Sequence, residues 1–117
     1  STLTLRAITK AVDIPISSVP KLFRDAVPSD AKNVLAKRLT DKAGKTGYMI
    51  IFDLLVPIQT ADRILILSFG QNWKVVLNTY TPVFGLLELT GNGYDVQAQI
   101  SAVQDSQMKI VIRAQAK

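Results

Sequence analysis

The feature that most constrains the fold is a strict alternation of apolar and polar residues near the C-terminus. It runs through segment 94–103, YDVQAQISAV, and continues in segment 107–115, QMKIVIRAQ. The alternating apolar residues are Val96, Ala98, Ile100, Ala102, Met108, Ile110 and Ile112. Because successive side chains of a β-strand point to opposite faces, this period of two predicts two strands, each with one buried face.

These two strands are expected to pair as a hairpin. A three-residue loop, 104–106, pairs Val103 with Gln107 and sets Ile100 opposite Ile110, so that the two apolar faces coincide. A two-residue loop would set polar residues opposite apolar ones, and the longer loop is therefore preferred. The other face of the hairpin is then polar, with Gln97, Gln99, Ser101, Lys109 and Arg113.

Four further segments have the composition of strands. Segment 48–56, YMIIFDLLV, is apolar on both faces and is expected to be a central strand that ends at Pro57. Asp53 interrupts it and requires a hydrogen bond or a cation, because burying a bare carboxylate is costly. The other three segments are 63–70 (RILILSFG), 73–80 (WKVVLNTY) and 83–90 (VFGLLELT).

The first 45 residues have a mixed character. Segment 2–12 fits both a helical stripe and a strand alternation, and both interpretations stay open. A short helix is expected between Pro20 and Pro28, since a proline in the first turn lacks an N–H that would be unpaired anyway. A second helix is expected over 30–43, where apolar residues recur at helical spacing before Gly44.

Together these segments predict one domain over residues 1–117. The expected fold is β-rich, mainly an antiparallel β sandwich or sheet of five or six strands, with one or two N-terminal helices; an α+β fold is the alternative. A hydrophobic content of 48% with 20% charged residues is typical of a globular chain. Long apolar strands without edge protection predict a homo-dimer or higher oligomer.

The absence of Cys and His narrows the possible chemistry. It excludes disulfides, thiolate or imidazole zinc sites, and catalytic triads that use a His base. We therefore predict no catalytic residues, no metal site and no cofactor, and we expect a protein that is not an enzyme. No apolar run approaches the roughly 20 residues of a membrane-spanning helix, so a soluble protein, secreted or not, is expected.

One motif resembles a nucleotide site. Gly44-Lys45-Thr46 matches the end of a phosphate-binding P-loop, which also needs a Gly five positions before Gly44. That position is Leu39. A P-loop also lies between a strand and a following helix, whereas the order expected here is helix, turn, strand. Nucleotide binding is therefore not predicted.

The net charge of +5 is concentrated in segment 21–45, which holds seven cationic and three anionic residues. Such a patch favours an anionic partner, for example nucleic acid. Two cationic residues of the C-terminal hairpin are further candidates for anion binding. The candidate anion-binding residues are Lys32, Lys37, Arg38, Lys42, Lys45, Lys109 and Arg113.

Aromatic and amide side chains form a second candidate site. Trp73 and Tyr80 stand at the two ends of one predicted strand, where loops cluster, and an exposed aromatic ring there would stack on a sugar. Amide side chains both donate and accept hydrogen bonds, as sugar hydroxyls require. The candidate glycan-binding residues are Trp73, Asn72, Tyr80, Gln97 and Gln99. Burial of Trp73 in the core would contradict this assignment.

Several short segments resemble the fungal immunomodulatory proteins, which are small and lectin-like. They are Ser1 with Leu3-Thr4-Leu5-Arg6, LTDKA at 39–43, LLEL at 86–89, Gly93-Tyr94, and IVIRAQ at 110–115. The resemblance implies an immunoglobulin-like or fibronectin-like sandwich, dimerisation through an N-terminal helix or exchanged strand, and binding to cell-surface glycans. The aromatic residues of that family's N-terminal helix are absent here, and no sugar-binding residue carries over.

Three functions follow as hypotheses. The first is a non-enzymatic, oligomeric protein that recognises a glycan or another cell-surface ligand. The second is a basic nucleic-acid-binding protein that uses the 21–45 patch. The third is a small viral or phage structural subunit, since small, basic, oligomeric β-proteins also serve in that role.

Overall fold

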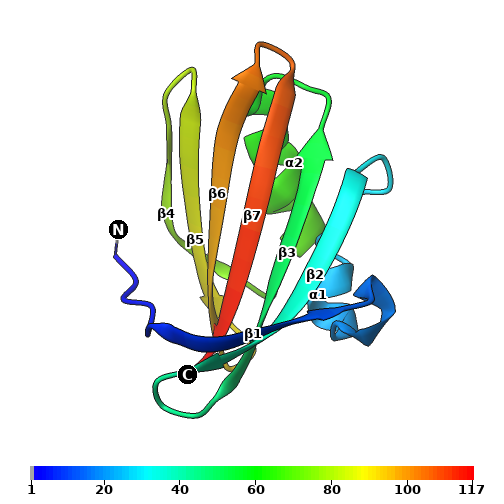
Figure 1. The fold of residues 1–117 in the computed structure, drawn as a ribbon. Coiled ribbons are helices and arrows are strands. Elements are labelled where there is room, and N and C mark those ends of the chain that lie inside the picture. The colour runs from blue at the N-terminus through cyan, green and yellow to red at the C-terminus, as the bar shows by residue number, and fades with distance from the viewer. Residues whose placement is uncertain (1) are drawn as a thin grey trace.

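The computed structural model describes residues 2–117, and all its strands belong to one antiparallel sheet (Figure 1). The sheet has seven strands in the order β1-β2-β3-β7-β6-β5-β4. The strands are β1 (Ile8–Ile14), β2 (Lys32–Asp41), β3 (Thr46–Leu54), β4 (Lys74–Tyr80), β5 (Phe84–Gly91), β6 (Tyr94–Gln104) and β7 (Gln107–Ala116). The helices are α1 (Lys21–Arg24), α2 (Ile58–Phe69) and a 3-10 turn, η1 (Ile16–Ser18). The β-rich class is confirmed, as a single sheet and not as the sandwich that the resemblance implies.

The order of the strands follows from one long crossover. Strands β1, β2 and β3 form a meander, after which α2 carries the chain behind the sheet to the far edge strand β4 (Figure 1). Strands β4 to β7 then meander back, and β7 pairs with β3 at the centre. Segment 48–56 was expected to be a central strand, and β3 confirms this because it is paired on both sides.

Helix α2 covers one face of the sheet and forms the core with it. It contacts β5 and β6, and the buried residues of α2 recur at helical spacing. Those residues are Ile58, Ala61, Asp62, Leu65 and Phe69. The prediction of a strand over 63–70 is therefore wrong. The apolar residues of this run lie on a helix, where some face the core and others, such as Leu67, face solvent.

The expected helix over 30–43 is also wrong. The segment forms β2, which pairs with β1 on one side and β3 on the other. Apolar residues at helical spacing had indicated a helix, yet Leu35 and Leu39 lie on one sheet face and Ala36 on the other. Pairing with two neighbours outweighs the weak local preference, as tertiary context often does. Only the short α1 remains of the two expected N-terminal helices.

The C-terminal hairpin has the expected register. Ile100 lies opposite Ile110, and both are buried. The expected three-residue loop is instead a turn at Asp105 and Ser106, preceded by a register shift between Ala102 and Gln104. A bulge absorbs the extra residue without changing which side chains face the core.

Residues 2–7, which we call the N-terminal strap, lead into β1, and β1 crosses in front of the lower part of the face opposite α2 (Figure 1). The backbone N–H of Thr2 donates to Glu88 Oε1 at 2.8 Å, and that of Arg6 donates to Gln115 Oε1 at 2.5 Å. The Arg6 side chain donates through Nε to Asp41 Oδ2 at 2.9 Å. Three buried polar side chains on the sheet thus find partners in the strap.

Candidate functional site

Within residues 2–117 no element covers the upper part of the sheet face opposite α2, and we call this part the open face (Figure 1). Strand pairing aligns its side chains in rows across the sheet. The middle row is Leu35, Ile51, Val111, Gln99 and Leu86, on β2, β3, β7, β6 and β5. Four of these five residues are apolar, and Leu35 is 62% exposed. An antiparallel sheet that faces water on one side normally alternates polar residues there.

The open face also gathers four of the seven predicted anion-binding residues. Lys32 and Lys109 lie on either side of Asp53 in one row, and Lys37 and Arg113 lie on either side of Met49 in another. Segments that are far apart in sequence are thus brought together. Asp53 accepts a hydrogen bond from Asn33 Nδ2 at 2.9 Å, which meets the expectation that it needs a partner.

Part of this positive charge is already engaged. Lys37 Nζ lies 2.6 Å from Asp13 Oδ1, and Arg113 donates to the backbone oxygen of Arg6 in the strap. Lys32 and Lys109 therefore carry the remaining positive charge of the face, with Asp53 between them. The local field is weaker than the sequence count of cations indicates.

The other three predicted anion-binding residues lie elsewhere, which corrects the idea of one continuous patch. Arg38 pairs with Tyr48 and points to the α2 side of β2, because neighbouring strand residues face opposite ways. Lys42 and Lys45 lie at the β2–β3 turn, where Lys45 Nζ donates to the backbone oxygen of Lys117 at 2.5 Å. The expected helix would have kept Arg38 and Lys42 on one side.

The predicted glycan-binding residues do not form one site. Trp73 is 7% exposed and packs between Phe23 and Phe69, so its ring lies in the core and is not available to stack on a sugar. Asn72 lies in the turn before β4, where its backbone oxygen accepts from Asn92. Tyr80 ends β4 on the α2 side of the sheet.

Gln97 and Gln99 lie on the open face, apart from the rest of that set. Gln97 Nε2 donates to Glu88 Oε2 at 2.8 Å, and Gln99 Nε2 donates to Gln97 Oε1 at 3.2 Å. Both amides are therefore partly committed to neighbours in the sheet. Glycan recognition stays a prediction without an assembled aromatic and amide site.

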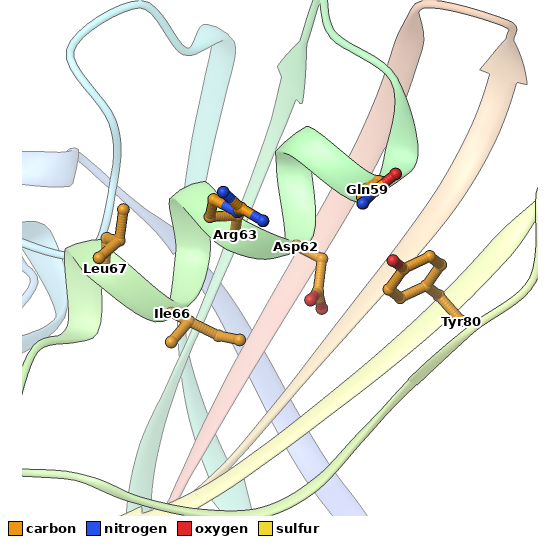
Figure 2. A pocket seen from close by; sticks show the side chains of 6 residues that line it. All are labelled: Gln59, Asp62, Arg63, Ile66, Leu67 and Tyr80. Carbon is orange, nitrogen blue, oxygen red and sulfur yellow. The ribbon is translucent and has the colours of Figure 1, made fainter.

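A pocket between α2 and β4 was not expected from the sequence (Figure 2). Its volume is about 260 Å³, and it is lined by Gln59, Asp62, Arg63, Ile66, Leu67 and Tyr80. The strand predicted over 63–70 hid it, because only a helix places residues 59, 62, 63 and 66 on one side. A carboxylate within a buried helical stripe was the signal that could have revealed the pocket.

Asp62 is the most unusual group in that pocket. It is 5% exposed, and Asn78 Nδ2 donates to its Oδ2 at 3.1 Å. Its Oδ1 is buried and has no hydrogen-bond partner in the part of the chain that the structure describes. Burial raises the pKa of Asp62 above its ordinary value, and the bond from Asn78 offsets part of this.

The P-loop-like stretch forms the tight β2–β3 turn. Gly44 has a φ of 74°, and the carboxylate of Asp41 accepts the backbone N–H groups of Ala43 and Lys45. A hydrogen bond from Arg6 lowers the pKa of Asp41, together with these N–H groups and against the effect of burial. A strand follows the turn, not a helix, so this stretch lacks the strand–loop–helix order of a phosphate loop; a strand, not the expected helix, also precedes it.

Two kinds of feature are absent from the described residues. Residues 2–117 contain no group of three carboxylates or other side chains arranged to hold a metal ion. No helix within them is long and apolar enough to cross a bilayer.

Comparison with known proteins does not assign this chain to a family. No protein-family description, no curated protein and no solved structure matches it. The resemblance to the fungal immunomodulatory proteins therefore stays a prediction.

Proposed function

We propose that this is a non-enzymatic binding protein that works as a homo-oligomer, with the open face as the contact between two copies. The observation that carries the proposal is the apolar middle row of the open face, with Leu35, Ile51, Val111 and Leu86 on four strands. A sheet covered by helix on one side only can bury such a row against a second layer. Small viral or phage structural subunits belong to this class of protein.

The size of the open face fits a stable dimer. Five strands spaced about 4.8 Å apart, with about six residues each rising about 3.3 Å, span roughly 24 by 20 Å. Side chains that project from the sheet and residues around the edge of the patch add to this area. The accessible surface of the patch is then of the order of the roughly 800 Å² that each partner buries in a standard interface. Two such faces packed together would form a β sandwich across the dimer.

The charges around the row fit a second copy better than a polyanion. Lys32, Asp53 and Lys109 alternate in sign along one row. A partner with the same alternation can place its carboxylate against a lysine and its lysines at the solvated rim. An apolar centre with a charged rim of both signs is the usual anatomy of a protein–protein contact.

Light scattering of the purified protein tests the proposal. We expect the wild type to be a dimer at micromolar concentrations and the double variant Ile51→Asp/Val111→Asp to be a monomer with an unchanged circular dichroism spectrum. Leu55→Asp is the matched control, because Leu55 is 60% exposed and lies after β3. A monomeric wild type, or a double variant that stays dimeric, would contradict the proposed contact.

Nucleic-acid binding through the same face is the second candidate. It is favoured by one observation, the convergence of Lys32, Lys37, Lys109 and Arg113 from distant segments. Binding of a single-stranded oligonucleotide should then weaken steeply with salt, and Lys32→Gln/Lys109→Gln should lower the log–log salt slope by about 1.4. A slope unchanged by these substitutions, or no binding at low salt, argues against this candidate.

A further inference from the structure

The pocket between α2 and β4, which we call the α2–β4 pocket, is separate from the open face. Helix α2 covers the opposite side of the sheet, and Tyr80 reaches toward it from β4 (Figure 2). Figure 2 shows Asp62 pointing from the helix toward the sheet, on the side where Tyr80 approaches. The pocket thus combines a buried carboxylate with an aromatic ring.

Asp62 lacks a charge partner as well as a hydrogen-bond donor for Oδ1. None of the ion pairs within residues 2–117 involves it, although Arg63 lines the same pocket. Its single partner is the amide of Asn78, which reaches Oδ2 only. A buried acceptor without a donor is unfavourable, and more so when the group is charged. A ligand that supplies a donor and a positive charge would remove this cost.

The walls of the pocket are apolar next to this carboxylate. Ile66 and Leu67 line it from α2, and Leu67 is 73% exposed to solvent. The ring of Tyr80 is exposed as well. The face of an aromatic ring attracts cations. The pocket therefore offers one buried anion, one aromatic face and an apolar wall.

We propose that the α2–β4 pocket binds a small primary ammonium compound with an apolar body, the ammonium group at Asp62 and the body against Leu67 and Tyr80. An ammonium supplies both a donor and the missing countercharge, whereas a sugar hydroxyl supplies the donor alone. The volume of about 260 Å³ suits a monoamine or an amino acid and is small for a nucleotide.

Two kinds of primary ammonium compound, a free amine and an amino acid, differ in whether they would contact Arg63. A free amine uses Asp62 and the apolar wall, and leaves Arg63 in solvent. An amino acid adds a carboxylate, which a guanidinium can bind through two parallel hydrogen bonds. Phenethylamine and phenylalanine have the same aromatic body and distinguish these two sources.

The test is a titration of ¹⁵N-labelled protein followed by NMR. Phenethylamine and phenylalanine should give saturable shifts at residues of α2 and β4, and Asp62→Asn should weaken binding at least tenfold. If phenylalanine binds more tightly than phenethylamine and Arg63→Gln removes this difference, an amino acid is the natural class of ligand. If the two compounds bind equally, the natural class is a simple amine. Phenylacetate and glucose, which lack an ammonium group, should not bind.

Three further variants keep the result interpretable. Tyr80→Ala should weaken binding several-fold even if Asp62→Asn perturbs the helix, and Gln99→Ala on the open face should leave it unchanged. The variant Ile51→Asp/Val111→Asp should bind the amine like the wild type, so failure of the dimer does not affect this test. Absence of shifts with either amine, binding of phenylacetate or glucose at the pocket, or full affinity in Asp62→Asn and Tyr80→Ala would overturn the proposal.

Discussion

At the scale of single residues, two buried aspartates show how the surroundings set the charge of a side chain. Asp41 accepts hydrogen bonds from Arg6 and from two backbone N–H groups, which lower its pKa. Asp62 has only the amide of Asn78, and burial raises its pKa. The first carboxylate stabilises a turn and the strap, whereas the second makes folding costly while it is ionised.

Replacing Asp62 with Asn should therefore make the protein more stable at neutral pH. The pKa of Asp62 is higher in the folded state than in the unfolded state. The contribution of Asp62 to folding stability is therefore fully present below the unfolded pKa and is lost as the pH rises through the folded pKa. Arg63 and Tyr80 are the other titratable groups lining the pocket, and neither changes this sign. We expect Asp62→Asn to raise Tm at pH 7 by a few degrees, which corresponds to a gain of about 1 kcal/mol in the free energy of unfolding.

Thermal unfolding between pH 4 and pH 8 measures this effect. The difference in Tm between Asp62→Asn and the wild type should shrink as the pH falls toward pH 4, because the carboxylate of Asp62 gains a proton. Asp30→Asn is the control, since Asp30 is exposed. A Tm difference that does not vary with pH would show that the charge of Asp62 is not its cause.

At the scale of elements, the close approach of β3 to β7 depends on a residue without a side chain. A Cβ on Gly47 would lie 2.4 Å from the backbone oxygen of Ala114, a contact that only a backbone shift can relieve. The equivalent Cβ on Gly85 would lie 3.2 Å from the Cβ of Tyr80, which is tight but possible. The central strand pair is therefore less tolerant of substitution than the β4–β5 pair.

Gly47→Ala should destabilise the sheet by about 1–3 kcal/mol, as overpacking does in other cores. Gly85→Ala, which adds the same methyl group, should cost clearly less. Urea unfolding of both variants measures the two free energies. Equal losses would mean that the backbone contact at Ala114 does not limit β3–β7 pairing.

The two wrong element assignments have physical causes at this scale. In segment 63–70 the apolar run 64–67 is compatible with a strand and with a helix. The residues that indicate a helix lie outside this run, with Pro57 at the start of α2 and Gly70 at its end. In β2, apolar residues face both sides of the sheet, since Leu39 and Ala36 lie on opposite faces and both are buried. A strand covered on both faces loses the period of two.

At the scale of the whole molecule, the strap connects the two ends of the chain through Arg6. Its side chain reaches Asp41 on β2 and the backbone oxygen of Ala116 on β7, and its backbone N–H reaches Gln115. These contacts join groups that are distant in sequence and close the lower half of the face. The open face is what the strap and β1 leave uncovered, so together they would limit the area available for the proposed second copy (Figure 1).

Arg6→Ala should lower stability by about 2 kcal/mol, since hydrogen bonds to charged groups contribute roughly 1.5–3 kcal/mol each and solvent replaces part of the loss. Hydrogen exchange should show faster exchange in residues 2–7, with the core of β3 and β7 less affected. Lys10→Ala is the control because Lys10 is exposed on β1. Unchanged exchange in the strap would contradict the anchoring role of Arg6.

The sequence alone determined the β-rich class, the central position of β3 and the register of the β6–β7 hairpin. These features rest on local alternation and on turns, which short segments encode by themselves. Only the tertiary structure decided that 58–69 is a helix, that Trp73 is buried, and that Lys32 and Lys109 share a face while Arg38 does not. The reason is that burial and juxtaposition depend on which distant strands pair, and no single segment contains that information.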